Sequence, residues 1–306
     1  MKKIAICFIA HTRQRYLPVI LNEFLDITQS LKDKIKIYVL NDENSSIENE
    51  NYVYELKQMG LDIENILLTT YFSKSQFIAN VCTEEFVVKV DEDIYMSSSG
   101  WEKFLLSGLK LNWNEIGLHA PCITTGIPSV EYFLDNCGDL EFANYMRIEF
   151  ANTHIPNLWG ANYETLNQKY KIGTFFDSVN ELDHCYKGIH PIRIRADLQK
   201  TLLDFCIQNK SWDGVSSELI SVKNIPYFCN SVFMIQRDHY SNVIDGLVNQ
   251  RFVFDNFDEV GLNQYIHQND LYYSFDNSVI AVHPSYNTIG DTYIELSDYF
   301  FSHVRY

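Results

Sequence analysis

The sequence is poor in positive charge and in long apolar runs, and each shortage excludes a class of protein. Its 306 residues include 24 Lys and Arg against 40 Asp and Glu, which gives a formal net charge of −16. This charge disfavours a broad contact with nucleic acid or an anionic bilayer, although a local basic patch could survive within it. No run reaches the roughly 18 apolar residues of a transmembrane helix. The 46% apolar content is ample for a packed core.

The sequence also lacks paired cysteines and flexible linkers. Its seven cysteines are scattered, odd in number and free of any C-x-x-C pair, which argues against a zinc or redox motif and favours reduced, buried thiols. The apolar run 4–10 is too short for a signal peptide and leads to polar residues 11–15, so we interpret it as a first strand. We expect a cytoplasmic protein, with peripheral attachment to the inner membrane surface as the alternative.

The first 120 residues alternate between strand and helix patterns. This alternation predicts an α/β fold with an open, mostly parallel central sheet flanked by helices. The predicted strands are 3–10, 36–40, 66–72, 86–90 and 115–120, and the predicted helices are 16–31, 47–59, 75–82 and 100–111.

The pattern is looser from residue 121 to residue 226. The clearer elements beyond residue 120 are helices 196–208 and 258–268, strand candidate 228–236 and a short last strand 279–282. We therefore expect a ligand-binding lobe of residues 1–120 and a second region of residues 121–306. With no linker between them, the two should pack as one domain.

Polar side chains follow several predicted strands, where ligands of open parallel sheets bind. These are residues 11–15, which include Arg13, then Asn41 with Asp42, and the sequence Asp91-Glu92-Asp93. Residues two apart in an extended segment face the same side, so Asp91 and Asp93 can point together. Two such carboxylates suit Mg²⁺ or Mn²⁺ that bridges to phosphate oxygens. A nucleotide diphosphate is the natural ligand.

The stretch from residue 73 to residue 106 resembles the GT-A fold glycosyltransferases, especially the large inverting family of bacterial polysaccharide-type transferases. That family has a Lys or Arg and an Asn before a strand, then an Asp-x-Asp motif and a helix. Here Lys74 and Asn80 precede strand 86–90, which runs into 91–97. The resemblance implies a GT-A, Rossmann-like sheet with an acceptor-side insertion and C-terminal helices.

The resemblance also implies roles for individual residues. Asp93 would ligate the metal, and Asp91 would contact the ribose or the metal's water shell. Asn41 and Asp42 would contact the base and ribose of the donor, with Lys74 and Arg13 as further donor-binding residues.

Asp258 and Glu259 open a predicted helix. Acids in a first helical turn are explained by capping and by the helix dipole. The family, however, takes its general base from a two-acid motif at a helix start, which this pair resembles in reversed order. We assign Glu259 as the base and keep Asp258 as the rival.

His283 follows the last predicted strand. A single His in such a place is commonly a structural hydrogen-bonding residue, yet an imidazole is also a reasonable ligand for Mn²⁺. His283 is thus the candidate third ligand. Other candidates are the basic run 190–195, which would meet a phosphate or pair with carboxylates, and Trp159, Tyr163 and Trp212, which would stack on a sugar or pack in the core.

The sequence therefore predicts a metal-dependent glycosyltransferase. It would move a sugar from a nucleotide diphosphate sugar to an acceptor hydroxyl, with inversion, in surface glycan synthesis. A glycan or lipid-linked glycan is the expected acceptor. The alternatives are an enzyme that glycosylates modified bases of phage DNA, a nucleotidyltransferase and a non-catalytic sugar-binding protein. Residues 11–16 contain no glycine, unlike the triphosphate loop of a nucleotidyltransferase.

Overall fold

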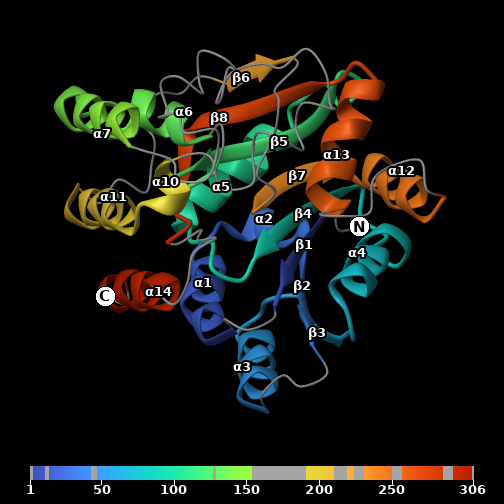
Figure 1. The fold of residues 1–306 in the computed structure, drawn as a ribbon. Coiled ribbons are helices and arrows are strands. Elements are labelled where there is room, and N and C mark those ends of the chain that lie inside the picture. The colour runs from blue at the N-terminus through green and yellow to red at the C-terminus, as the bar shows by residue number, and fades with distance from the viewer. Residues whose placement is uncertain are drawn as a thin grey trace.

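A computed structural model describes residues 3–10, 14–42, 47–126, 129–153, 191–209, 219–223, 231–249, 257–284 and 292–304. Its centre is an eight-stranded mixed sheet in the order β3-β2-β1-β4-β7-β5-β8-β6 (Figure 1). The strands are β1 (Ile4–Ile9), β2 (Ile35–Asn41), β3 (Ile63–Leu67), β4 (Phe86–Asp91), β5 (Ile116–Ile123), β6 (Leu219–Val222), β7 (Val232–Gln236) and β8 (Tyr272–Ala281).

Most of the sheet is parallel, as the sequence predicts. Strand β1 pairs in parallel with β2 and β4, β2 with β3, and β5 with β8. Strand β7 is antiparallel to both β4 and β5, and β6 is antiparallel to β8. Because β7 is antiparallel to both of its neighbours, β4 and β5 run in the same direction, and β8 runs parallel to β5. The carboxyl ends of six strands therefore share one edge.

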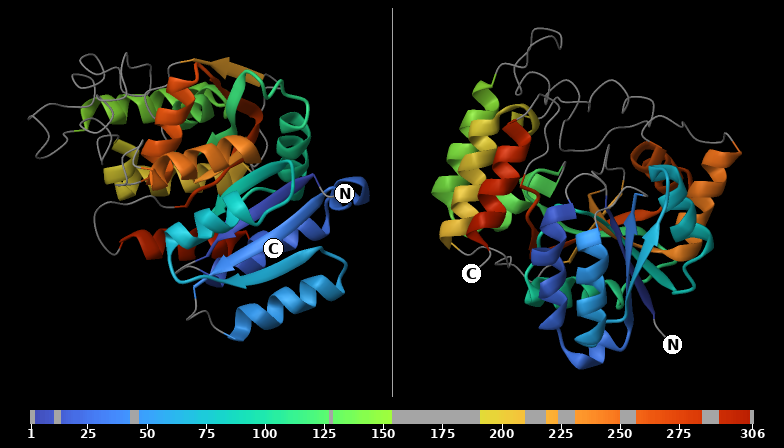
Figure 2. Two further views of the ribbon diagram at one scale, coloured as in Figure 1. Left: turned by 90° about the vertical axis from the view of Figure 1, so that its right-hand side faces the viewer. Right: turned by 90° about the horizontal axis from the view of Figure 1, so that it is seen from below.

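Helices cover both faces of this sheet (Figure 2). The helices and 3₁₀ turns are η1 (Gln14–Tyr16), α1 (Leu17–Asn22), η2 (Glu23–Leu25), α2 (Gln29–Lys32), α3 (Ile47–Gln58), α4 (Tyr71–Asn80), α5 (Ser98–Gly108), α6 (Ser129–Asn136), α7 (Leu140–Asn152), α10 (Pro191–Ile194), α11 (Ala196–Asn209), α12 (Arg237–Val248), α13 (Phe257–Gln268) and α14 (Thr292–His303). Helices α4, α12 and α13 gather on one side of the sheet, and α1 and α3 lie on the other (Figures 1 and 2).

Aromatic side chains join the helices to the sheet. Phe8 of β1 packs against Phe24 and Trp101, with ring centroids 6.1 and 6.3 Å away. Helices α7, α11 and α14 lie side by side, and the rings of Phe142 and Phe205 stack at 3.9 Å between the first two (Figures 1 and 2). This burial of large rings supplies the main driving force for packing.

The C-terminal helix docks on the body of the protein. Phe300 is fully buried, and Phe301 stacks on Tyr16 at 4.3 Å. Arg15 and Tyr16 both donate hydrogen bonds to the carboxylate of Asp298, at 3.0 and 2.8 Å. Helix α14 is thereby held beside the segment that follows β1.

Three predicted elements differ from the structure. The helix predicted over residues 16–31 is divided into η1, α1, η2 and α2, and Thr28 is extended at ψ 145° before α2 begins. The strand predicted at 66–72 lies at β3, and helix α4 already begins at Tyr71 because Thr70 and Ser73 form a capping box. The last strand is longer than 279–282 and begins at Tyr272.

Candidate functional site

The ends of β2, β1 and β4 lie next to one another. Ile9 of β1 is in register with Leu40 of β2 on one side and with Asp91 of β4 on the other. Asn41 and Asp42 continue from Leu40, and the Asp-x-Asp segment continues from β4. Parallel pairing therefore brings the acidic segments to one edge, as the sequence predicts.

Asn41 is fully buried at the end of β2. Its amide nitrogen donates a hydrogen bond to Oδ1 of Asn65 on the neighbouring strand β3. Its own carbonyl oxygen, Oδ1, is buried and has no hydrogen-bond partner among the described residues. A buried carbonyl of this kind costs free energy unless a donor reaches it. The site thus offers an acceptor to an N–H group of a ligand.

Lys74 links the ends of β1 and β2. Its ammonium Nζ donates hydrogen bonds to the carbonyl oxygen of Ala10 at 2.6 Å and to Oδ1 of Asp42 at 2.5 Å. The Lys74 side chain is only 1% exposed, whereas that of Asp42 is 23% exposed. A buried ammonium needs such partners, and Lys74 consequently fixes the carboxylate of Asp42 at the edge.

Asp91, the first acid of the motif, pairs with a lysine of its own strand. Nζ of Lys89 lies 2.5 Å from Oδ1 of Asp91, and the two side chains share a face because they are two residues apart. Burial raises the pKa of Asp91 above its usual value, and the Lys89 ammonium partly offsets that effect. One oxygen of Asp91 is therefore engaged by a cation of the protein.

Asp93, the second acid, lies opposite His283. Nε2 of His283 is 3.5 Å from Oδ2 of Asp93, and both side chains are almost completely buried. A two-way backbone bridge between Tyr95 and Val282 brings these distant parts of the chain together, with N–O distances of 2.9 and 2.8 Å. The sequence singled out both residues, and the structure places them face to face.

Thr125, just after β5, holds the other side of the imidazole. Its hydroxyl oxygen lies 3.0 Å from Nδ1 of His283 and 3.3 Å from the carbonyl oxygen of His283. An Nδ1–H that donates to this hydroxyl leaves the lone pair of Nε2 directed at Asp93. Two acceptors that face each other need a proton or a cation between them. The contact suits either a protonated imidazole or a bound cation.

The three predicted metal ligands are close but not arranged around one point. Within the described residues, no group of three or more His, Cys, Asp or Glu side chains has the geometry to hold a metal ion. Asp93 and His283 form a pair, while Asp91 turns to Lys89. A carboxylate and an imidazole whose other ring nitrogen is held by a hydroxyl are a chemically suitable donor pair for Mn²⁺. Diphosphate oxygens and water would have to complete its coordination.

The predicted catalytic acids lie at the start of α13. Helix α13 leads directly into β8 and packs against α12, where the rings of His239 and Tyr265 lie 5.7 Å apart. The side chains of Asp258 and Glu259 are outside the described residues, as are Arg13, Trp159, Tyr163, Trp212 and His190. Arg195 is described, and it pairs with Asp197 and Glu149 rather than lying at this edge.

Sequence reasoning missed three residues of this site: Lys89, Thr125 and Asn65. The sequence could have indicated Lys89, because a lysine two residues before Asp91 in an apolar strand lies on the same face as Asp91. It could not have indicated Thr125 and Asn65, because their roles depend on β5 and β3 lying beside distant segments.

No family model and no curated protein matches the chain. Among solved structures, it is similar to a TarS fragment from S. aureus solved with UDP-GlcNAc, at 15% identity over 40% of this chain and 34% of the other, with a TM-score of 0.32. It is similar to the glycosyltransferase GlyE of Streptococcus pneumoniae TIGR4 at 19% identity over 56% and 44%, with a TM-score of 0.31. It is also similar to the galactosyltransferase LgtC, solved with donor and acceptor sugar analogues, at 12% identity over 89% and 72%, with a TM-score of 0.42. The matched part is thus less than half the length of the TarS fragment and of GlyE.

Proposed function

We propose that this protein is a metal-dependent glycosyltransferase that uses a nucleotide diphosphate sugar as its donor. The observation that carries the proposal is the buried pair of Asp93 and His283 at the carboxyl edge of the sheet, 3.5 Å apart. The neighbouring ends of β1, β2 and β4 provide the remaining contacts that such a donor needs. Open parallel sheets bind nucleotides at this edge.

The nucleoside part of the donor would lie over the end of β2. The buried Oδ1 of Asn41 would accept a hydrogen bond from a base N–H group, and the partly exposed carboxylate of Asp42 would accept one from a ribose hydroxyl. Lys74 would hold Asp42 in place through its own buried ammonium. These contacts explain why polar side chains are buried at a strand end, where they are otherwise costly.

The diphosphate would lie beside the Asp-x-Asp segment. Asp93 and His283 would hold Mn²⁺ or Mg²⁺, and Asp91, tied to Lys89, would contact the ribose or the water shell of the metal. When bound, the metal would neutralise negative charge on the leaving diphosphate. Thr125 would keep Nε2 of His283 turned towards Asp93.

The acceptor hydroxyl would be activated from the first turn of α13. Glu259, or its neighbour Asp258, would remove the proton as the oxygen attacks the anomeric carbon from the face opposite the leaving group, which inverts configuration. General-base help of this kind contributes about 10²–10⁴-fold. A glycan or lipid-linked glycan is the acceptor that we favour, in surface glycan synthesis; a nucleic acid is disfavoured by the net charge of −16.

A panel of nucleotide sugars tests this function. We expect one donor to raise the thermal midpoint of the purified protein in the presence of Mn²⁺ and to be hydrolysed slowly without an acceptor. Glu259→Gln and Asp258→Asn should both retain the donor-dependent thermal shift, and one of them should lose transfer. If no donor shifts the midpoint with or without metal, the proposal is wrong.

A further inference from the structure

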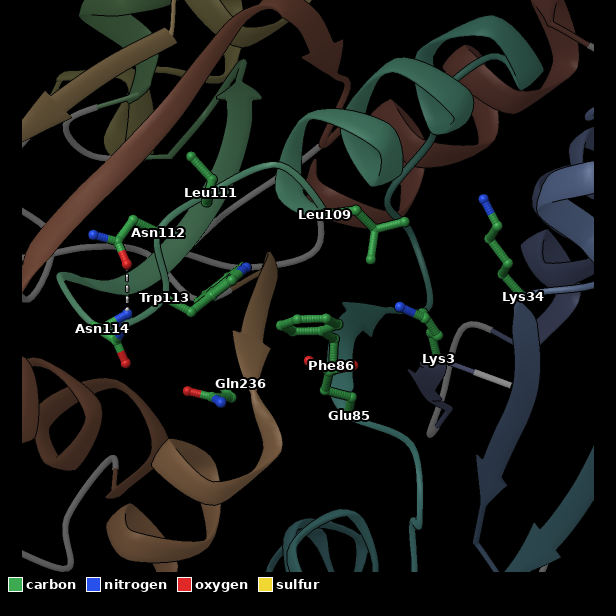
Figure 3. A pocket seen from close by; sticks show the side chains of 10 residues that line it. All are labelled: Lys3, Lys34, Glu85, Phe86, Leu109, Leu111, Asn112, Trp113, Asn114 and Gln236. Atoms are coloured by element: carbon green, nitrogen blue, oxygen red, sulfur yellow. Dashed lines mark hydrogen bonds between the residues drawn. The ribbon is translucent and has the colours of Figure 1, made fainter. Parts of the chain in front are cut away.

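A second pocket opens at the opposite edge of the sheet, where the parallel strands begin. It has a volume of about 500 Å³ (Figure 3). Lys3 and Lys34 precede β1 and β2, Phe86 and Gln236 are paired residues of β4 and β7, and Trp113 precedes β5. The volume is in the range of small-molecule sites. This pocket lies at the amino ends of the strands, whereas the Asp93–His283 site lies at their carboxyl ends.

Two fixed aromatic rings form its base. The rings of Phe86 and Trp113 pack at 5.3 Å, and the indole N–H of Trp113 donates a hydrogen bond to the carbonyl oxygen of Gly108 at 2.9 Å. Phe86 is 6% exposed and Trp113 7% exposed, so each ring offers only a small apolar strip to the pocket. The flat ring of a nucleobase could not stack on the full face of either side chain. A ligand with a compact C–H surface fits such a strip better.

Amide side chains line one side of these rings. Figure 3 shows Asn112 and Asn114 on the side of Trp113 that faces away from the lysines, and Gln236 below Trp113. The loop that carries the two asparagines is fixed, because the carbonyl oxygen of Asn112 accepts hydrogen bonds from Glu115 and Ile116 at 3.0 and 3.2 Å. Amides both donate and accept, so this wall suits the hydroxyl groups of a polyol.

The other side of the pocket is positively charged. Lys3 lies near Phe86, and Lys34 lies beyond Lys3 on the same side (Figure 3). Glu85 is the acidic residue of the lining, which leaves two cations against one anion in a chain whose net charge is −16. The backbone holds the two lysines together, since the amide of Lys3 donates to the carbonyl oxygen of Lys34 at 2.7 Å. A local excess of positive charge favours an anionic group on the ligand.

We propose that this pocket binds a carboxylated sugar, such as a uronic acid residue of an oligosaccharide. The carboxylate would bind between Lys3 and Lys34, the hydroxyl groups would bond to Asn114 and Gln236, and the C–H face would lie on the exposed strip of Phe86 and Trp113. A sugar fits this lining better than a nucleotide because the rings are too buried to stack on a base. The inference does not depend on the donor site at the other edge.

The test is a titration of the full ¹⁵N-labelled chain with trigalacturonate, following the indole N–H signal of Trp113. We expect a saturable shift that is unchanged by UDP with Mn²⁺, because the two sites lie at opposite edges. Lys3→Met combined with Lys34→Met should weaken binding at least about tenfold, as expected for the loss of charge-assisted hydrogen bonds. Asn114→Ala should weaken it as well.

Matched controls separate a built site from general electrostatics. Lys57→Met combined with Lys103→Met changes the net charge equally on exposed parts of α3 and α5 and should leave the titration unchanged. Neutral maltotriose should bind much more weakly than trigalacturonate. The proposal is overturned if no saturable shift appears up to about 10 mM ligand, far above a useful Kd. It is also overturned if maltotriose or UMP binds as tightly, or if the control pair weakens binding equally.

Discussion

Nε2 of His283 lies 3.5 Å from Oδ2 of Asp93, and backbone pairing brings the two segments that carry them together. Strand β8 ends at Ala281, and the next residue, Val282, bridges to Tyr95, two residues after Asp93. The two side chains therefore meet because main-chain hydrogen bonds align their segments. Substitution of either side chain should leave this frame in place.

Loss of either member of the pair should remove activity without unfolding the protein. We expect Asp93→Asn and His283→Gln each to lower kcat/KM by about 100-fold or more, because several kcal/mol of charge stabilisation at the diphosphate would be lost. The measurement is donor hydrolysis with Mn²⁺, beside circular dichroism of each variant. Full activity in a folded Asp93→Asn protein would refute the metal assignment.

Thr125 should act through the imidazole rather than through packing. Thr125→Val keeps the volume but removes the hydroxyl beside Nδ1 of His283. Loss of a hydrogen bond to a metal-ligating imidazole costs about 10–100-fold in metal affinity. Donor hydrolysis measured at increasing Mn²⁺ concentration should show a matching rise in the apparent dissociation constant for Mn²⁺. Thr125→Ser retains the hydroxyl and should restore most of the affinity; equal losses in both variants would indicate a packing role.

The Lys74–Asp42 pair should contribute to stability as well as to the site. Lys74→Met removes a buried ammonium and should lower the free energy of unfolding by about 2–3 kcal/mol, since Asp42 then loses its cation. Asp42→Asn in the Lys74→Met background should recover about 1 kcal/mol or more. Urea unfolding of the two single variants and the double variant gives the coupling energy. Strictly additive effects would show that the pair is not coupled.

A buried histidine should make stability depend on pH. Burial lowers the pKa of His119 to about 4, with the negative charge of Asp276 partly opposing this. The unfolded chain, with an imidazole pKa near 6.5, then binds a proton that the folded protein excludes. This contribution is complete above about pH 6.5 and is lost as the pH falls to about 4, by about 3 kcal/mol in total.

Urea unfolding between pH 7.5 and pH 4 measures that slope. His119→Gln should flatten it by the contribution of one proton. Phe104→Leu is the control, because Phe104 stacks on the imidazole at 5.0 Å and its loss weakens packing without removing the titrating group. The prediction fails if the free energy of unfolding changes with pH equally steeply in His119→Gln and in the unmodified protein.

The parallel half of the fold was predictable because its strands are apolar and its helices periodic. Strands β1, β2 and β4 lie where the sequence places them. Strand β8 was mostly missed because its buried face carries polar residues. Ser274 and Asp276 are buried there and bond to His119 and Ser107, with Ser274 Oγ 3.1 Å from Nδ1 and Ser107 donating to Asp276 at 2.5 Å. Such internal polar partners have no signature in a single sequence.

The residues of the candidate site that directly follow strands were predictable from the sequence. The contacts that they make with other side chains were not. Asn41, Asp42, Asp91 and Asp93 lie at the expected edge because parallel strands end together. The pairing of Asp91 with Lys89 was not anticipated and gives the two acids different partners. The structure places His283 beside Asp93, and the role of His283 as a metal ligand stays a prediction.

Strand β7 has a consequence for how the chain is made. It comes late in the sequence, yet it lies between β4 and β5 and connects the two halves of the sheet. When only the segments up to β6 have left the ribosome, the fragment β3-β2-β1-β4 has an unsatisfied edge at β4, and β5 and β6 lack the strands with which they pair. Such open edges invite association with other chains. Any division of the protein into co-expressed pieces should therefore keep residues 232–236 with whichever piece must remain monomeric.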